Sequence, residues 1–320
     1  MDTSIPALPR PSLCRAVVVG GGTMGADVAV VLARAQAGVT VVEPAADRHD
    51  TIRERTRAGL AERGMAELAQ KIQVVASLDA VAWEGVHLVI ECIPESLPMK
   101  RKLFADLVGR APAGALLASN SSSFPISEIA QGLDTRARML GLHFFMPAHL
   151  IPLVEVVLGA DSDVASGEHL AAFMRRCGMV PVLVRKDVPG FLGNRLQHAL
   201  TREAFALIQE GVASAEDVDA AVRFGFGFRF LAAGPVMQRD HAGLDVHCAA
   251  TATTYPSLSK ADGPFPILTE RVAAGKLGMK TGEGFYAWTP ETMAAEKARY
   301  AALLRAGLAL IEKELPPIEP

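Results

Sequence analysis

The sequence has no surplus of basic residues. Its 32 Lys and Arg are set against 35 Asp and Glu, which gives a net charge of −3 over 320 residues. Proteins that bind nucleic acid or anionic lipid through their surface usually concentrate positive charge there, so we expect neither partner. Half of the residues are apolar, which is enough for a large core. A small-molecule partner is expected instead.

Cysteine is scarce as well. The four cysteines are far apart, form no CxxC pair and mostly lie in apolar stretches, which favours reduced thiols. The amino terminus, MDTSIPALPRPSLCR, lacks the basic and then apolar layout of a signal peptide, and the first long apolar run is interrupted by glycines and an aspartate. We therefore expect a soluble cytoplasmic protein.

Several common catalytic signatures are missing. The chain has no HExxH, no clustered Cys/His ligands, no GxSxG and no P-loop, which argues against the commonest metal, serine-hydrolase and kinase sites. His241 and His247 are interpreted as surface or packing residues, and no metal is expected.

What the sequence does contain is an alternation of short β-branched runs with longer helical patterns. Strands are predicted at 15–20, 39–43, 71–76, 87–92, 115–120, 139–144, 153–159 and 180–184. Apolar residues recur at helical spacing over 24–37, 96–110 and 164–177. The βαβ order predicts a doubly wound, mainly parallel sheet with helices on both faces.

A glycine-rich motif follows the first predicted strand. VVVGGGTMGADVAVVLARA fits GxGxxG with Gly20, Gly22 and Gly25 at the start of a helix. Glycines let the backbone turn tightly and approach a pyrophosphate, which binds to the N–H groups of the helix start. The second strand ends at Glu43, where a carboxylate can bind both ribose hydroxyls. These features predict a Rossmann-type nucleotide-binding domain.

The carboxylate of Glu43 also bears on the choice of cofactor. It would repel a 2′-phosphate, and Pro44, Ala45 and Ala46 after it offer no cation. NAD is therefore favoured over NADP, although Arg48 leaves NADP open.

The pattern changes after Asp187. From Phe191 onward apolar residues recur at helical spacing, with one further strand suggested near 284–288. Pro189 indicates a helix start, because the residue before a proline is usually extended and a following helix can therefore begin only from the proline onward. We expect an α/β protein with an NAD-binding domain over 1–187 and an all-helical domain for substrate binding and dimerisation over 188–320.

The stretch GLHFFMPAHLIPLVEV, residues 141–156, contains His143 and Glu155 inside two apolar runs. From the residues alone His143 is either a catalytic base or a structural histidine, and Glu155 needs a partner because burying an unpaired carboxylate is costly. Together with GxGxxG, ASNSSSFPISEIA, KDVPGFLGNRL and KLGMKTGEGFYAW, this stretch resembles the L-3-hydroxyacyl-CoA dehydrogenase family in order and spacing over almost the whole chain.

The resemblance implies roles for seven residues. The family's catalytic histidine corresponds to His143, its partner glutamate to Glu155, the serine that contacts the substrate hydroxyl to Ser122, and the asparagine of PGF-x-x-NR to Asn194. The positions that contact the nicotinamide cofactor correspond to Glu95, Lys100 and Lys280.

The chemistry of alcohol oxidation suits these residue types. An imidazole, with an ordinary pKa of about 6.5, can take the hydroxyl proton at neutral pH while a cofactor takes the hydride. Glu155 would fix the tautomer of His143, while Ser122 and Asn194 would hold the substrate oxygen. Two structural alternatives are open: Ser122 as a helix cap for 126–131, and Asn194 as an ordinary residue of a first helical turn.

Three departures from the family bear on the substrate. Met146 replaces the asparagine of HFFNP, and the segment between Glu43 and the strand at 71 is shorter than in the acyl-CoA enzymes. That segment either contacts the phosphates of CoA or is a solvated helical hairpin. Third, Arg229 in GFGFRFLAAGP resembles the L-gulonate and L-carnitine dehydrogenase branches. It could bind a substrate carboxylate in a bidentate pair, or form a salt bridge at the surface or at a dimer interface.

We expect an NAD-dependent oxidoreductase that interconverts a 3-hydroxyacyl compound of the acyl-CoA type and its 3-oxo form. The alternatives are a dehydrogenase of a small free 3-hydroxy acid with Arg229 on the carboxylate, and a non-catalytic NAD-binding protein. A homodimer is expected from the family and from the apolar helices of the carboxy-terminal half.

Overall fold

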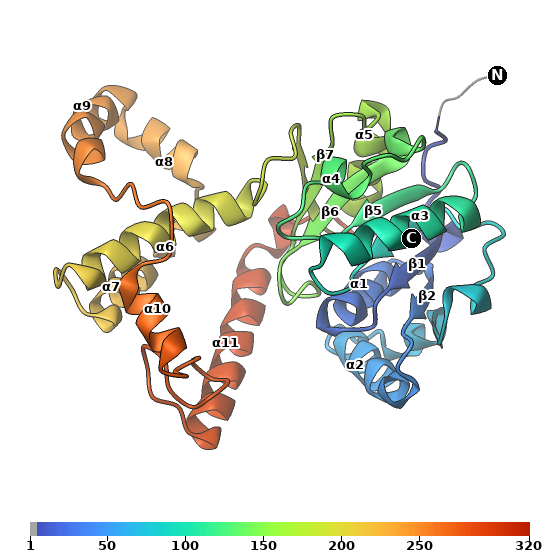
Figure 1. The fold of residues 1–320 in the computed structure, drawn as a ribbon, viewed down its shortest axis with the longest axis horizontal. Helices are drawn as coiled ribbons and strands as arrows, with labels where there is room; N and C mark the ends of the chain where they lie inside the picture. The colour runs from blue at the N-terminus through green and yellow to red at the C-terminus, as the bar shows by residue number, and fades with distance from the viewer. Residues whose placement is uncertain (1–4) are drawn as a thin grey trace. The chain divides into compact units, whose positions relative to one another are not determined.

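The computed structural model describes residues 5–320, so the first four residues of the expected domain 1–187 and of the amino-terminal stretch lie outside the described residues. The chain divides into two compact units (Figure 1). One ends at Arg195 and also contains Glu312–Pro320; the other is Leu196–Ile311. The last residues of the chain, expected in the helical domain, therefore belong to the first unit, where Ile318 forms an antiparallel bridge with Cys177.

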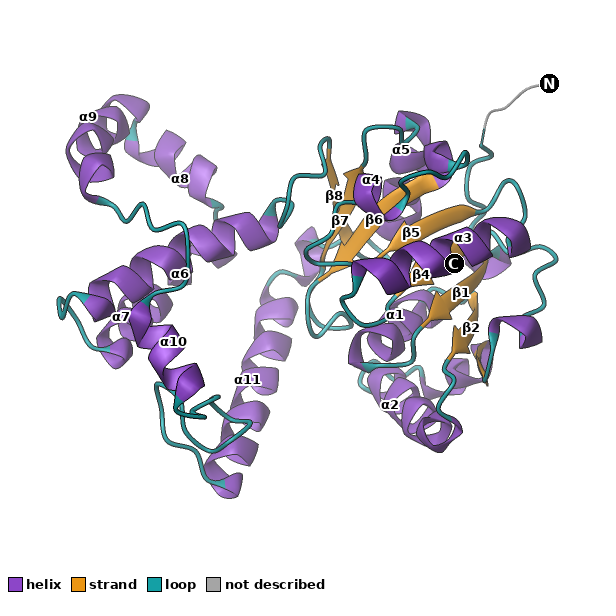
Figure 2. Ribbon diagram, viewed as in Figure 1, coloured by secondary structure: helices purple, strands orange, loops and turns teal. Residues whose placement is uncertain are grey.

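The first unit is built on one eight-stranded sheet, and all eight predicted strands are confirmed (Figure 2). The strands are β1 (Arg15–Val19), β2 (Gly38–Val42), β3 (Ile72–Val75), β4 (Leu88–Glu91), β5 (Leu116–Ser119), β6 (Met139–Phe144), β7 (Leu153–Leu158) and β8 (Val180–Val184). Their order in the sheet is β3-β2-β1-β4-β5-β6-β7-β8. The sheet is parallel from β3 to β6, β7 runs antiparallel to β6, and β8 is parallel to β7.

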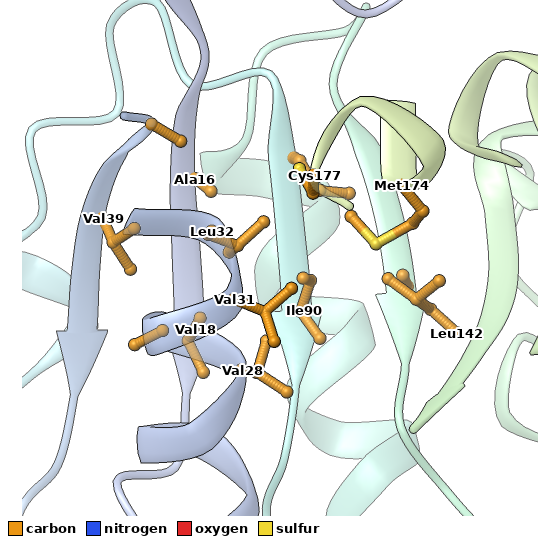
Figure 3. Close-up of a cluster of buried hydrophobic side chains, with 14 of the residues drawn as sticks. Ala16, Val18, Val28, Val31, Leu32, Val39, Ile90, Leu142, Met174 and Cys177 are labelled. Atoms are coloured by element: carbon orange, nitrogen blue, oxygen red, sulfur yellow. The ribbon is translucent and has the colours of Figure 1, made fainter. Parts of the chain in front are cut away.

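Helices cover both faces of this sheet, as the alternation of strand and helix patterns predicts. They are α1 (Thr23–Arg34), α2 (His49–Ala61), α3 (Leu97–Arg110), α4 (Ile126–Ile129) and α5 (Val164–Arg176). Successive residues of β1 point to opposite faces, so Val18 packs in one apolar cluster and Val17 in the other. Figure 3 shows the first cluster, in which Val28 and Leu32 of α1 lie over the sheet. The fold is a Rossmann-type, doubly wound sheet.

The second unit is helical. Helix α6 (Gly193–Gln209) leads into it from the first unit, and it contains α7 (Ala215–Ala221), α8 (Pro235–Ala242), α9 (Leu244–Thr254), α10 (Pro266–Ala273) and α11 (Pro290–Leu310). The strand suggested near 284–288 does not form. Glu283 makes only isolated bridges, to Gly278 and Ala287, because the glycine-rich segment turns back on itself within a few residues.

The topology brings the expected site residues of the first unit to one edge of the sheet. The carboxyl ends of parallel strands meet at the same edge, where ligands of open α/β sheets bind. β1 ends before Gly20 and β2 before Glu43. β5 ends before residues 121–123, three serines that we call the serine loop, and His143 lies at the carboxyl end of β6.

Candidate active site

The glycine motif forms an open helix start between β1 and α1. A Cβ on Gly25 would lie 1.8 Å from the carbonyl oxygen of Gly20, and Gly20 itself has φ +103° and no room for a side chain beside Cys92. A Cβ on Gly22, the N-cap of α1, would meet nothing within 4 Å. The backbone N–H groups at this helix start are thus reachable, which fits the pyrophosphate of a dinucleotide.

The carboxylate of Glu43 is fixed next to this helix start. Oε2 accepts a 3.1 Å hydrogen bond from the amide of Gly21, and Oε1 accepts one of 3.1 Å from the amide of Ala45. The guanidinium of Arg48 lies 3.4 Å from Oε2. Arg48, which left NADP open in the sequence, therefore pairs with Glu43 itself.

His143 and Glu155 form a buried pair. They are cross-strand partners in the antiparallel register of β6 and β7, which is why residues twelve apart in sequence meet. Nδ1 of His143 lies 2.7 Å from Oε2 of Glu155, and the residues are 3% and 0% exposed. The rings of Phe145 and Phe191 pack against the imidazole, with centroids 4.7 and 5.6 Å away. The pair is held in one geometry and is shielded from water.

The second oxygen of Glu155 is also occupied. Oε1 accepts hydrogen bonds from the amides of Leu192 (3.0 Å) and Gly193 (2.7 Å), at the start of α6. Burial by itself raises the pKa of Glu155, but the hydrogen bond from His143 and the amide of Gly193 outweigh it, so the pKa lies below its ordinary value. Glu155 is ionised at neutral pH and can stabilise an imidazolium on His143.

The hydroxyl of Ser122 completes the arrangement on the other side of the ring. Oγ lies 3.1 Å from Nε2 of His143. In the tautomer whose Nδ1–H donates to Glu155, Nε2 is an acceptor, and the serine hydroxyl donates to it. The alternative that Ser122 caps a helix is wrong: α4 has Pro125 at its N-cap and no side-chain cap. Ser122 is thus free to contact a substrate oxygen that approaches Nε2.

The remaining predicted residues differ in surroundings. Asn194 is the second residue of α6, and Glu95 follows β4 with its carboxylate on the serine loop. Lys100, in the first turn of α3, is 1% exposed, and its Nζ lies 2.7 Å from Oε1 of Glu91 and 3.2 Å from Oε2 of Glu95. Sequence reasoning missed Glu91. The signal available for it was an acidic residue at the end of the apolar run HLVIEC.

Two predicted residues belong to the second unit. Arg229 lies in a short 3-10 helix, Gly227–Leu231, and Lys280 in a turn after α10. Both are exposed, and among residues 5–320 neither guanidinium nor ammonium makes a hydrogen bond or ion pair. Met146, in the first unit, is 63% exposed.

Residues 5–320 contain neither a cluster of metal-binding side chains nor a membrane-spanning helix. They contain no group of three or more His, Cys, Asp and Glu side chains that could hold a metal ion. No helix within this range is both long and apolar enough to span a bilayer.

Two family models match the chain. The model for the NAD binding domain of 3-hydroxyacyl-CoA dehydrogenase covers residues 15–188, and the model for the C-terminal domain of the same enzymes covers 190–288. The chain belongs to the 3-hydroxyacyl-CoA dehydrogenase family. It is an NAD-dependent oxidoreductase that acts on CH–OH.

Relatives span nearly the whole chain. It is 34% identical over 296 residues to 5-formyl-3-hydroxy-2-methylpyridine 4-carboxylate 5-dehydrogenase of Mesorhizobium japonicum, covering 90% of this chain and 96% of that one. It is 35% identical over 288 residues to the human mitochondrial hydroxyacyl-coenzyme A dehydrogenase, covering 84% and 89%. A crystal structure of the 5-formyl-3-hydroxy-2-methylpyridine 4-carboxylic acid 5-dehydrogenase, described as an NAD+ dependent dismutase, superposes with a TM-score of 0.88 at 32% identity, covering 94% of this chain and 99% of that one.

Proposed function

We propose that the protein interconverts a 3-hydroxy compound and its 3-oxo form, with His143 as the general base of the oxidation. The observation that carries this is the line Ser122 Oγ, His143 Nε2, His143 Nδ1 and Glu155 Oε2, in which both ring nitrogens have a defined partner. A histidine held in this way presents its one lone pair at Nε2, where it accepts from the hydroxyl of Ser122, and has a carboxylate behind it. This is the arrangement that proton abstraction from an alcohol requires.

Each residue has a stated part in this reaction. Nε2 of His143 takes the substrate hydroxyl proton, and Glu155 stabilises the imidazolium that results. Ser122 and Asn194 hold the substrate oxygen against Nε2. NAD+, when bound, accepts the hydride from the carbon that carries this hydroxyl. Gly20, Gly22, Gly25, Glu43, Glu95 and Lys280 are proposed to contact the cofactor. In the reverse direction His143 returns the proton to the oxygen.

A small substrate with a free carboxylate is the class we favour. The Mesorhizobium japonicum relative, named for a pyridine carboxylate, matches almost end to end. The basic segment after Glu43 is also less available for CoA phosphates than its sequence suggests, because Arg55 is paired with the buried Asp27 and Arg53 with Asp50. Arg229 carries a guanidinium that can take such a carboxylate.

A 3-hydroxyacyl-CoA thioester is the second candidate substrate. It is supported by the human relative, which is named for hydroxyacyl-coenzyme A. This substrate would place the protein in fatty acid metabolism. The two classes differ in where the substrate carries its charge: on a carboxylate close to the reacting carbon, or on distant phosphates.

Steady-state kinetics with NAD separates the two classes. We expect kcat/KM to be higher for free 3-hydroxy acids, such as 3-hydroxybutyrate and L-gulonate, than for 3-hydroxybutyryl-CoA. Arg229→Leu should raise KM for the preferred acid, while Arg239→Leu on α8 serves as the control. A higher kcat/KM for the thioester would assign the protein to the acyl-CoA class, and turnover of no 3-hydroxy compound despite NAD binding would support a non-catalytic protein.

We also propose that the protein is a homodimer. Large apolar side chains of the second unit are exposed in the single chain, among them Phe224, Phe228, Val236 and Leu244. An apolar surface of this kind on a helical unit is typical of an oligomer interface. Light scattering should give twice the mass of one chain, and a monomeric mass would contradict the proposal.

A cytoplasmic location is proposed on the state of the thiols. Cys14, Cys92, Cys177 and Cys248 are all free in the structure, which is usual where the environment is reducing. Fractionation of the native cell should recover the protein with cytoplasmic markers, and recovery with an organelle would contradict this.

A further inference from the structure

A buried ion pair lies beside the site, at the carboxyl end of β4. Glu91 is the last residue of β4 and Lys100 lies in the first turn of α3, with 2.7 Å between Oε1 and Nζ. Neither residue has more than 1% of its surface exposed. Replacing such a pair by apolar residues of similar volume often leaves a protein as stable or more stable. Stability alone is therefore a weak reason for these two charges.

The polar atoms of the pair are tied to their surroundings on all sides. Glu91 Oε1 also accepts from the amide of Ile93 at 2.7 Å, and Oε2 accepts from the hydroxyl of Ser119 at 2.6 Å. The ammonium of Lys100 also donates to the carbonyl of Ile93 at 3.3 Å and lies 3.2 Å from Oε2 of Glu95. The ammonium is enclosed by these acceptors, so it has no donor left for a ligand. Its connection to the site runs through Glu95.

Glu95 in turn holds the serine loop after β5. Its Oε1 accepts from the hydroxyl of Ser121 (2.6 Å) and from the amides of Ser122 (3.1 Å) and Ser123 (2.9 Å). Burial raises the pKa of Glu95, but the hydrogen bond from Ser121 and the charge of Lys100 outweigh it, and the pKa is lowered. The loop forms neither helix nor strand, so this carboxylate supplies the hydrogen bonds that regular structure would otherwise give.

We propose that Glu91 and Lys100 are positioning residues for the reaction: their ion pair fixes Glu95, and Glu95 fixes the serine loop so that the hydroxyl of Ser122 meets Nε2 of His143. The inference rests on the proposed function, since it gives Ser122 a part in the chemistry. It assigns Lys100 a role through Glu95 and not through direct contact with the cofactor.

A double-mutant cycle in the full-length protein tests this. The pair Glu91→Gln with Lys100→Met removes both charges at once and nearly keeps the side-chain shapes, and Ser122→Ala removes the hydroxyl. We expect the first pair to lower kcat about 10- to 100-fold, because small displacements of a positioning group have effects of that order. On that background Ser122→Ala should cost much less than it does in the wild type. Equal losses from Ser122→Ala on both backgrounds would overturn the proposal.

A second variant provides the same test if the protein with Glu91→Gln and Lys100→Met does not fold. The side chain of Glu95 is 37% exposed, and in Glu95→Gln the ammonium of Lys100 keeps its ion pair with Glu91. This variant therefore leaves no buried charge unpaired, and it should show the same coupling to Ser122→Ala. The control is Lys102→Met, an exposed lysine on the same helix, which should leave kcat unchanged.

Amide hydrogen exchange separates failure of this inference from failure of the proposed function. The amides of Ser122 and Ser123 should exchange faster in Glu95→Gln and in the Glu91/Lys100 variant than in the wild type, whether or not a substrate is known. Unchanged exchange in both variants would overturn the positioning role. Absence of turnover in the wild type would instead contradict the proposed function, and faster exchange would still show that the pair holds the loop.

Discussion

The amide of Gly193 donates a 2.7 Å hydrogen bond to Oε1 of Glu155, so the first turn of α6 is tied directly to the carboxylate behind the proposed base. This contact depends on the missing side chain, because a Cβ on Gly193 would lie 2.5 Å from Cζ of Phe145. The ring of Phe145 also packs on His143. The glycine thus allows helix, carboxylate and imidazole to approach one another.

Gly193→Ala is therefore expected to affect both stability and turnover. Overpacking of this kind costs about 1–3 kcal/mol, and the shift needed to relieve it moves the amide away from Glu155. We expect a lower free energy of unfolding in urea together with a lower kcat. Gly307→Ala in α11 is the matched control, since its Cβ would meet nothing within 4 Å, and it should be neutral or stabilising by up to about 1 kcal/mol. Unchanged kcat in Gly193→Ala would contradict the coupling.

His143→Gln should lower kcat by roughly 10²–10⁴, because general-base catalysis contributes about that much. Glutamine keeps a polar side chain at this buried position, so the circular dichroism spectrum and the urea midpoint should remain close to wild type. His241→Gln on α8, where the histidine is exposed, should leave kcat unchanged. Near wild-type turnover in His143→Gln would show that another group takes the proton.

The pairing of His143 with Glu155 was predictable, but the reason for its spacing was not. Two apolar runs of β-branched residues indicate two strands, and an unpaired buried glutamate requires a partner. The connection between the two strands, residues 145–152, is too short for a parallel crossover, so an antiparallel pair could be expected. The register, which places residues 143 and 155 opposite each other, is not given by either pattern and depends on how the connection folds.

The ion pair of Glu91 and Lys100 could not be found from local patterns. The helix sequence LPMKRKLF contains two lysines, and nothing in their spacing shows that Lys100 is buried while Lys102 is exposed. Lys100 is buried because the first turn of α3 lies beside the carboxyl ends of β4 and β5, where Glu91 and Ser119 meet. The return of Ile318 to the first unit could not be predicted either, because a bridge of a single residue leaves no periodic pattern in the sequence.

The stability of the protein should depend on pH through Glu155. Its folded pKa is below the ordinary glutamate value of 4.5, so the folded state binds the proton less tightly than the unfolded state does. The stabilisation is present above pH 4.5 and is lost as the pH falls through the folded value. The difference in unfolding free energy between wild type and Glu155→Gln should therefore shift against the wild type between pH 7 and pH 3. Urea titrations of both proteins measure it, and a difference independent of pH would contradict the prediction.

Glu43→Ser should relax the preference for NAD. The carboxylate that would repel a 2′-phosphate disappears, and Arg48, now paired with it at 3.4 Å, is released to bind that phosphate. Juxtaposed like charges cost several kcal/mol, so the ratio of kcat/KM for NADP to that for NAD should rise about tenfold or more. The double variant Glu43→Ser with Arg48→Ala loses both the repelling carboxylate and the guanidinium that could bind the 2′-phosphate. Its ratio of kcat/KM for NADP to that for NAD should therefore rise less. If both variants accept NADP equally well, Arg48 has no part in it; if neither does, the discrimination resides elsewhere than at Glu43.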